Sequence, residues 1–223
     1  MMVILMLAAV VPSLEDEAKS LLYRAKVGEI LRYRVEMSFE DQGVKATLIG
    51  SGETRVDKVD VLGPITLFQK LGQMKLKSGN DEMDIANDSE STMIIKATGE
   101  IIEVRGKNVT TDNLRTTRAT MVVVPSNPVK PGDTWTHQIP KSTGIRAMTF
   151  EYRAVGTEKI GARDTMKIEF KVRETEGNLP IQADGTAWLS TVDGKTVRIL
   201  ANVTNAPMGA STTKFTLRSE RTD

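Results

Sequence analysis

The strongest constraint on the fold is a strict alternation between apolar and polar residues in two stretches of the chain. In residues 31–39 every odd position is apolar, and the even positions carry Arg, Glu or Ser. In residues 165–175 Met166, Ile168, Phe170 and Val172 alternate with charged residues. Successive side chains of a β-strand point to opposite faces of a sheet, so each stretch predicts a strand with one apolar and one polar face.

Much of the remaining chain continues this strand-like pattern. The expected further strands are residues 44–61, 93–95, 101–104, 149–156, 186–189, 196–203 and 213–219. Residues 65–77 suit a helix or a strand, and Thr66, Gly72 and the strand-rich neighbours favour a strand. We therefore expect a mainly β single domain, built on a large curved antiparallel sheet that forms a half-barrel or an open barrel. Gly50 and Gly52 leave one strand face thin, which indicates a bend or bulge.

One amphipathic helix is expected near the N-terminus, over residues 13–24. Ser13 is a suitable cap, three acidic residues follow it, and Leu14, Ala18, Leu21 and Leu22 form one apolar stripe. Residues 80–91 are expected to form an acidic loop. Residues 105–117 are expected to form a polar loop, with at most a helical turn over 112–115.

A turn at residues 129–135, Val-Lys-Pro-Gly-Asp-Thr-Trp, separates two halves of the chain. Pro131 and Gly132 suit the central positions of a type II turn, because Pro fixes φ near −65° and Gly accepts positive φ. A weaker copy surrounds Gly28, and the hairpin expected at Gly99 resembles the one expected at Gly194. These landmarks suggest two similar halves, about 26–105 and 129–219, although chance matching of common turn residues explains them equally well.

The first eleven residues are apolar throughout. This length is too short for a membrane-spanning helix but suits the core of a signal peptide, although no basic residue precedes it. A buried N-terminal strand is the alternative. We expect residues 1–12 to be a signal peptide, a mature chain that begins between Ala9 and Ala18, and a single extracytoplasmic domain over 13–223 that does not span the membrane.

The composition excludes several classes of function. With 30 basic and 29 acidic residues and only 4% aromatic residues, the chain has no basic stripe or stacking platform for nucleic acid. It contains no cysteine and one histidine, His137, so neither a catalytic triad nor a two-histidine metal site can be built. We expect no enzyme activity, no metal and no cofactor, and a surface position for His137. The spacing of Asn80, Glu82 and Asp84 resembles a calcium loop but lacks its glycine and its final acid.

The turn at 129–135, the strand around Tyr152 and the segment from Gly185 through Trp188 to Asp193-Gly194 resemble a family of uncharacterised bacterial cell-envelope domains. The resemblance covers mainly residues 120–205. These domains are similar to the β half-barrels of periplasmic lipoprotein carriers, which implies a bent sheet with an apolar concave face. This chain departs from the lipoprotein members because it lacks the anchoring cysteine.

The apolar strand faces direct the functional hypothesis. One dry face of a large curved sheet must be covered by the sheet itself, by loops, by a partner or by a ligand. We expect a non-enzymatic binding module for a lipid or another apolar ligand in the concave face. An envelope structural or protein-interaction domain without a ligand is the alternative. The expected ligand-binding residues are Tyr33, Met37, Phe150, Tyr152, Met166, Ile168 and Phe170.

Overall fold

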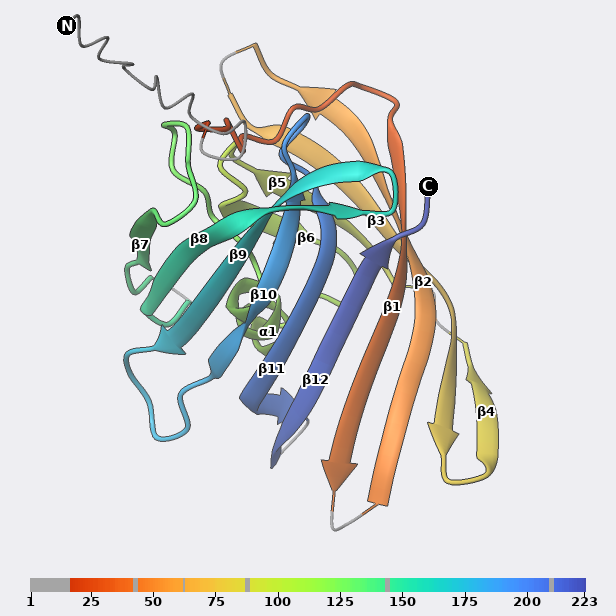
Figure 1. The fold of residues 1–223 in the computed structure, drawn as a ribbon. Helices are drawn as coiled ribbons and strands as arrows, with labels where there is room; N and C mark the ends of the chain where they lie inside the picture. The colour runs from red at the N-terminus through yellow and green to blue at the C-terminus, as the bar shows by residue number, and fades with distance from the viewer. Residues whose placement is uncertain (1–16, 42–43, 62, 87–88, 143–144, 209–210) are drawn as a thin grey trace, which may run out of the picture.

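The computed structural model describes residues 17–41, 44–61, 63–86, 89–142, 145–208 and 211–223, and their fold is one curved antiparallel sheet with a short helix (Figure 1). The expected signal peptide lies outside these residues. The strands are β1 (Ile30–Asp41), β2 (Val44–Val59), β3 (Ile65–Ser78), β4 (Asp81–Ile85), β5 (Glu90–Ile95), β6 (Ile101–Arg105), β7 (Thr134–Ile139), β8 (Met148–Ile160), β9 (Arg163–Glu174), β10 (Gln182–Ser190), β11 (Thr196–Met208) and β12 (Ser211–Arg221). The prediction of a mainly β fold is confirmed.

The sheet consists of two meanders that meet at its centre. The strand order is β6-β5-β3-β2-β1-β12-β11-β10-β9-β8-β7, with β4 paired to β3 outside this path. The chain starts at the central strand β1, moves outward to β6, crosses to the other edge and returns from β7 to β12. The end strands β6 and β7 are not paired with each other, so the sheet is open. The two similar halves inferred from the turns remain a hypothesis.

The crossing between the meanders contains the helix α1 (Thr111–Ala119), which lies on the inner, concave side of the sheet (Figure 1). Thr110 caps it, because its side-chain oxygen accepts a hydrogen bond from the N–H of Asn113 at 3.2 Å. The expectation of a polar loop with one helical turn was therefore wrong. Thr and Asn are poor helix formers, and burial of Ala119 against the sheet supplies the missing stability.

The expected helix over residues 13–24 is also wrong for its described part. Residues 17–27 form an extended strap whose backbone hydrogen bonds go to distant segments. Lys19 exchanges two with Val129, Tyr23 donates to Ala97, and Arg24 donates to Asp193. In a helix these backbone groups would instead form hydrogen bonds within the segment itself. The side chain of Leu21 is buried in the core. Contacts with the rest of the fold thus override the local amphipathic pattern.

The core lies between the inner face of the sheet and the segment that follows α1. Met121, Val123, Val124 and Val129 of this segment are buried in the same hydrophobic cluster as the inward side chains of β8, β9 and β10. Trp135 on β7 donates a hydrogen bond from Nε1 to the carbonyl of Val123 at 2.8 Å, and the Tyr152 hydroxyl accepts one from the N–H of Val123 at 3.1 Å. Half of the concave face is therefore filled by the protein's own chain.

Several local expectations hold. Residues 65–77 lie in strand β3. Gly132 has φ +91° and Asp133 donates a hydrogen bond to the carbonyl of Lys130, as the predicted turn requires. The register between β2 and β3 shifts at Gly50 and Gly52, which confirms the predicted bulge. The expected loop over residues 80–91 is wrong: this segment contains β4, which pairs with β3, and the start of β5. Among the described helical residues no segment has the length and hydropathy needed to cross a bilayer.

Candidate functional site

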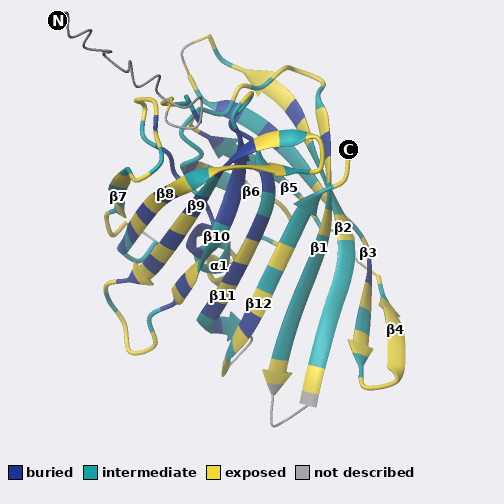
Figure 2. Ribbon diagram, viewed as in Figure 1, coloured by how far each residue is buried: buried dark blue, intermediate teal, exposed yellow. Residues whose placement is uncertain are grey.

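The inner face of the sheet is covered unevenly. On β8 and β9 the inward side chains Phe150, Met166 and Ile168 are fully buried. On β1 the equivalent apolar positions Val35 and Met37 are only half-buried, and Figure 2 shows the change from dark blue strands to teal ones across the sheet. The same alternation of residues thus produces a closed core in one half and an incompletely covered apolar face in the other.

This incompletely covered face forms a groove of about 710 Å³. Strands β1, β2, β3, β5, β6, β11 and β12 supply lining residues on one side, and α1 with the residues that lead into it supplies them on the other. The apolar lining includes Tyr33, Val35, Met37, Leu67, Met93, Val104, Leu114, Phe215 and Leu217. Most of the lining surface is apolar, but polar side chains line the groove as well, and Glu53, Lys70 and Glu90 among them are charged. Such a groove suits an apolar molecule with few hydrogen-bonding groups.

Of two inward glycines on β2, Gly52 lines the groove, whereas a Cβ at Gly50 would meet the Met74 side chain at 3.0 Å. Gly50 and Gly52 of β2 lie opposite Val35 and Tyr33 of β1 and occupy inward positions. A Cβ added at Gly52 would meet only the side chain of Leu71, at an ordinary distance of 3.6 Å. The side of β2 that carries these glycines thus forms the floor of the groove. A side chain placed at Gly52 would project into the groove.

The structure separates the sequence-predicted ligand residues into two groups. Tyr33 and Met37 lie together in the groove on β1. Phe150, Tyr152, Met166, Ile168 and Phe170 lie together on β8 and β9 and are at most 3% exposed, with their side chains packed in the core. The sequence reasoning did not select Val35, Leu67, Met93, Leu114, Phe215 or Leu217 as ligand residues. Apart from Leu114, which lies on α1, these residues lie on strands, and the strand pattern does not show which part of an apolar face is left uncovered.

Burial and neighbouring charges modify the one ionisable group in the apolar lining. Burial raises the pKa of the Tyr33 hydroxyl, and the nearby guanidinium of Arg221 partly offsets this effect. The hydroxyl therefore stays protonated at physiological pH and can donate a hydrogen bond. The other ionisable side chains that line the groove are Glu53, Lys70 and Glu90, from strands β2, β3 and β5.

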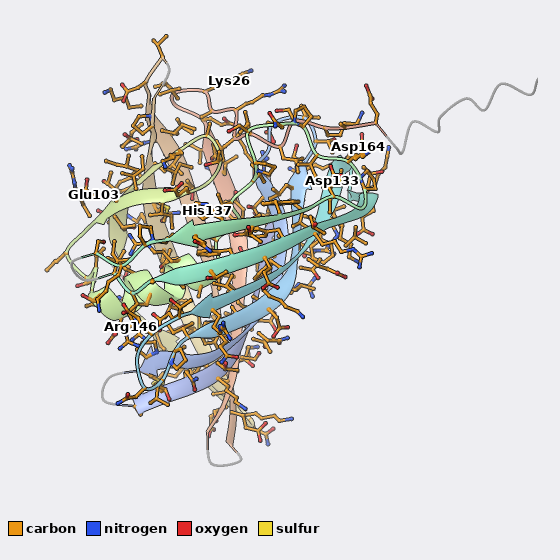
Figure 3. The ribbon with its side chains drawn as sticks, turned by 90° about the vertical axis from the view of Figure 1, so that its left-hand side faces the viewer. Lys26, Glu103, Asp133, His137, Arg146 and Asp164 are labelled. Carbon is orange, nitrogen blue, oxygen red and sulfur yellow. The ribbon has the colours of Figure 1, made fainter. Side chains whose placement is uncertain are left out.

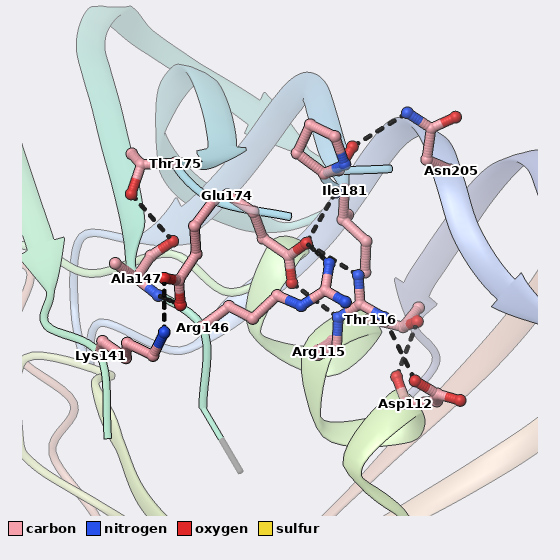
Figure 4. Close-up of polar contacts among 12 residues, drawn as sticks. Asp112, Arg115, Thr116, Lys141, Arg146, Ala147, Glu174, Thr175, Ile181 and Asn205 are labelled. Atoms are coloured by element: carbon pink, nitrogen blue, oxygen red, sulfur yellow. Dashed lines mark hydrogen bonds and ion pairs between the residues drawn. The ribbon is translucent and has the colours of Figure 1, made fainter. Parts of the chain in front are cut away.

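A buried ion-pair cluster holds α1 in place across the sheet (Figure 4). The Glu174 carboxylate at the end of β9 accepts two hydrogen bonds from Arg115, at 2.7 and 2.8 Å, and one from the N–H of Ile181 at 2.9 Å. Arg146 adds a contact at 3.3 Å. Burial opposes ionisation of Glu174, but the hydrogen bonds from Arg115 and Ile181 outweigh it and lower its pKa. The helical wall of the groove thus depends on Glu174.

The expected surface position of His137 holds only in part, because its side chain is 22% exposed. His137 lies on the edge strand β7 (Figure 3), and its ring is 5.6 Å from that of Phe150 on the inner side. Its Nε2 is buried without a hydrogen-bond partner and lies 3.8 Å from a carboxylate oxygen of Glu100. Burial lowers the pKa of His137, Glu100 partly offsets this shift, and Lys96 adds to it.

We expect His137 to make the protein less stable as the pH falls through the weakly acidic range. A histidine whose pKa is lower in the folded state does not affect the free energy of unfolding above its unfolded pKa of about 6.5. Below that pH the unfolded chain takes up the proton more readily, so stability falls until the pH has passed the folded-state pKa. Urea unfolding at pH 7.5 and 5.5 should show this loss in the wild type and a smaller one in His137→Phe. Equal losses in the two proteins would contradict the assignment. The test is specific because the chain has one histidine.

The outer face of the sheet carries a second, larger depression of about 1130 Å³. A transverse row of polar residues crosses it in register, from Glu151 through Lys171, Asp184, Asn202 and Thr216 to Ser38. The row mixes acids, a base and neutral groups. It lacks a convergent set of groups for one small ligand, so the groove is the stronger candidate for a small-molecule site.

Comparison with known proteins adds little to this geometry. No protein family model matches the sequence, and no curated protein matches it. A Bacteroides fragilis crystal structure described as having a YmcC-like fold aligns with 92% of this chain and 100% of its own, at 12% sequence identity and a TM-score of 0.36. The hypothetical lipoprotein YmcC from Escherichia coli aligns over 89% of both chains, at 12% identity and a TM-score of 0.35. Because the sequence identities and TM-scores are this low, these structures carry no argument about function.

Proposed function

We propose that this protein is a non-enzymatic, extracytoplasmic binding module that holds an apolar ligand of the acyl-chain type in the groove between β1–β3 and α1. The observation that supports it is the contrast between the two halves of one apolar face. Its β8–β10 part is buried by the protein's own chain, whereas its β1–β3 part borders a groove of about 710 Å³. This volume lies within the range of about 300–1,000 Å³ that is typical of ligand pockets.

An acyl chain suits the groove better than a polar metabolite does. The lining is dominated by aliphatic, Met and aromatic side chains, and the flexible thioethers of Met37 and Met93 can adapt to chains of different shape. The extracytoplasmic setting is supported by the apolar residues 1–11, which have the pattern of a signal-peptide core.

The proposal predicts a dependence of affinity on chain length. Each CH₂ group buried in the groove contributes about 0.8 kcal/mol, which is roughly a fourfold gain in affinity. Displacement of a fluorescent fatty acid from the delipidated protein by ligands of 8 to 14 carbons should show this rise until the groove is full. A flat response, or none up to the solubility limit, would contradict an acyl-chain site.

A substitution that fills the groove should abolish this binding without unfolding the protein. Gly52→Leu places a side chain on the groove floor, where the added Cβ finds room, and we expect at least a tenfold loss of affinity. The matched control is Gly156→Leu on β8, where an added Cβ meets no atom within 4 Å and which does not line the groove. Equal binding by both variants would place the ligand elsewhere.

A domain that binds a protein partner without any small ligand is the second candidate. The polar depression of the outer face, with its row of residues from Glu151 to Ser38, favours it. If no fatty acid of any chain length bound to the protein, this second function would be favoured.

A further inference from the structure

A row of polar side chains crosses the floor of the groove. Thr54 of β2 lies opposite Gln69 of β3, and Gln69 lies opposite Ser91 of β5. All three residues line the groove, as do Leu67 and Leu71, the positions two residues to either side of Gln69. Since every second side chain of a strand points to the same face, Gln69 points inward together with these two leucines. The row is therefore a polar band on a face that is apolar on both sides of it.

The side chains of this polar band lack partners in the protein. All three are half-buried, and within the described residues none of them forms a side-chain hydrogen bond with another protein group. A polar group that is partly withdrawn from water costs free energy until another hydrogen-bonding partner replaces that water. A ligand that brings donors and acceptors to the band supplies such partners, whereas a purely apolar chain would cover the band and leave it unpaired.

The charged residues at the groove stand apart from the polar band. Glu53, Lys70 and Glu90 alternate with it along the same three strands, so they border the groove from positions that face the outer side of the sheet. Lys70 is the one cation among the described lining residues; its side chain is 57% exposed, and its Nζ lies 3.2 Å from a carboxylate oxygen of Glu90. Glu53 contacts Arg32 at 3.4 Å. No described lining residue therefore offers an unpaired positive charge to an anionic head group.

We propose that the ligand of the groove carries an uncharged head that both donates and accepts hydrogen bonds, as a glycerol monoester does, and that Gln69, Thr54 and Ser91 bind this head. The inference rests on the proposed function, because the acyl chain of the same molecule occupies the apolar part of the groove. The Gln69 amide has two N–H donors and a carbonyl acceptor, and each hydroxyl of the band both donates and accepts, so the band matches hydroxyl and ester groups. A carboxylate only accepts, and its charge is costly to bury where no cation neutralises it.

The test compares ligands that share one acyl chain and differ in the head. Glycerol monododecanoate, methyl dodecanoate and dodecanoate displace a fluorescent fatty acid from the delipidated protein, each below the concentration at which it forms micelles. All three should bind through the chain, and we expect the glycerol ester to bind about tenfold or more tightly than the other two. Gln69→Leu should lower the affinity for the glycerol ester to that for the methyl ester, and leave the affinity for the methyl ester unchanged.

Gln73→Leu is the matched control, because it is the same substitution on the same strand at an exposed position that does not line the groove. This variant should keep the preference for the glycerol ester. Should Gln69→Leu fail to fold, the isosteric Thr54→Val should still weaken the preference severalfold. Retention of the full preference by the folded variants of the polar band, or binding of dodecanoate by the wild type as tight as that of the glycerol ester, would overturn the inference and leave the groove intact. Absence of binding by all three ligands would instead overturn the proposed function, and the inference with it.

Discussion

Replacement of Glu174 by alanine is expected to lower the free energy of unfolding by about 3–5 kcal/mol, because removal of one partner leaves the others buried and unpaired. The Glu174 side chain has no exposed surface, and that of Arg115 is only 11% exposed. The variant would also leave the N–H of Ile181 without its acceptor. Urea denaturation followed by tryptophan fluorescence measures this loss of stability, because Trp135 packs on the core and Trp188 is buried.

Glu176→Ala is the matched control for this experiment. Glu176 lies two residues further along and pairs with Lys141 at 2.9 Å, but the Lys141 side chain is 72% exposed. An exposed ion pair contributes about 0–1 kcal/mol, so the control should change stability little. A loss of less than about 1 kcal/mol for Glu174→Ala would show that the cluster does not hold α1 against the sheet.

Replacement of Gly194 by alanine is expected to cost about 2–5 kcal/mol for two separate reasons. Gly194 has φ +69°, a conformation that costs an L-residue about 1–2 kcal/mol. A Cβ there would also overlap the carbonyl oxygens of Leu21 and Leu22 in the strap, and overpacking against backbone adds about 1–3 kcal/mol. The strap would have to move away from the turn between β10 and β11.

Gly161→Ala separates the two costs. Gly161 has φ +60° as well, but an added Cβ meets no atom within 4 Å. Thermal unfolding should therefore show only the conformational part of the loss at Gly161 and the full loss at Gly194. Equal melting temperatures for the two variants would mean that the strap does not lie against Gly194 in solution.

The buried Lys195 shows why the strap is held so closely at this turn. Lys195 is 2% exposed, and its ammonium group contacts Glu29 at 2.5 Å and Asp193 at 3.0 Å. Glu29 follows the strap and Asp193 precedes Gly194, so one cation joins the two segments. Burial opposes ionisation of Asp193, but hydrogen bonds from Ser190 and Lys195 outweigh it and lower its pKa.

The candidate site could be predicted only in part from the sequence. The alternation on β1 placed Tyr33 and Met37 on the apolar face, and both line the groove. The same argument selected Phe150 and Met166, which are fully buried in the core. Alternation identifies which face of a strand is apolar, but it contains no information about what covers that face.

The position of Glu174 in the sequence pattern of β9 indicated a buried ion pair, but the sequence analysis did not include it. It continues the parity of Met166, Ile168 and Phe170 and so falls on the inward face of β9. An acid on an apolar face requires a buried partner, and Arg115 is that partner. The inward position was visible in the sequence, whereas the identity of the partner, 59 residues away, was not.

The sequence by itself determined most of the strands, their apolar faces, the turn at Gly132 and the bulge at Gly50 and Gly52, because each depends on the backbone preferences of a few adjacent residues. The tertiary structure alone decided the rest. It made residues 17–27 a strap and residues 111–119 a helix, and it filled one half of the concave face with residues 121–129 while the other half kept a groove. These outcomes depend on backbone hydrogen bonds and ion pairs between residues far apart in the chain, which outweigh weak local propensities.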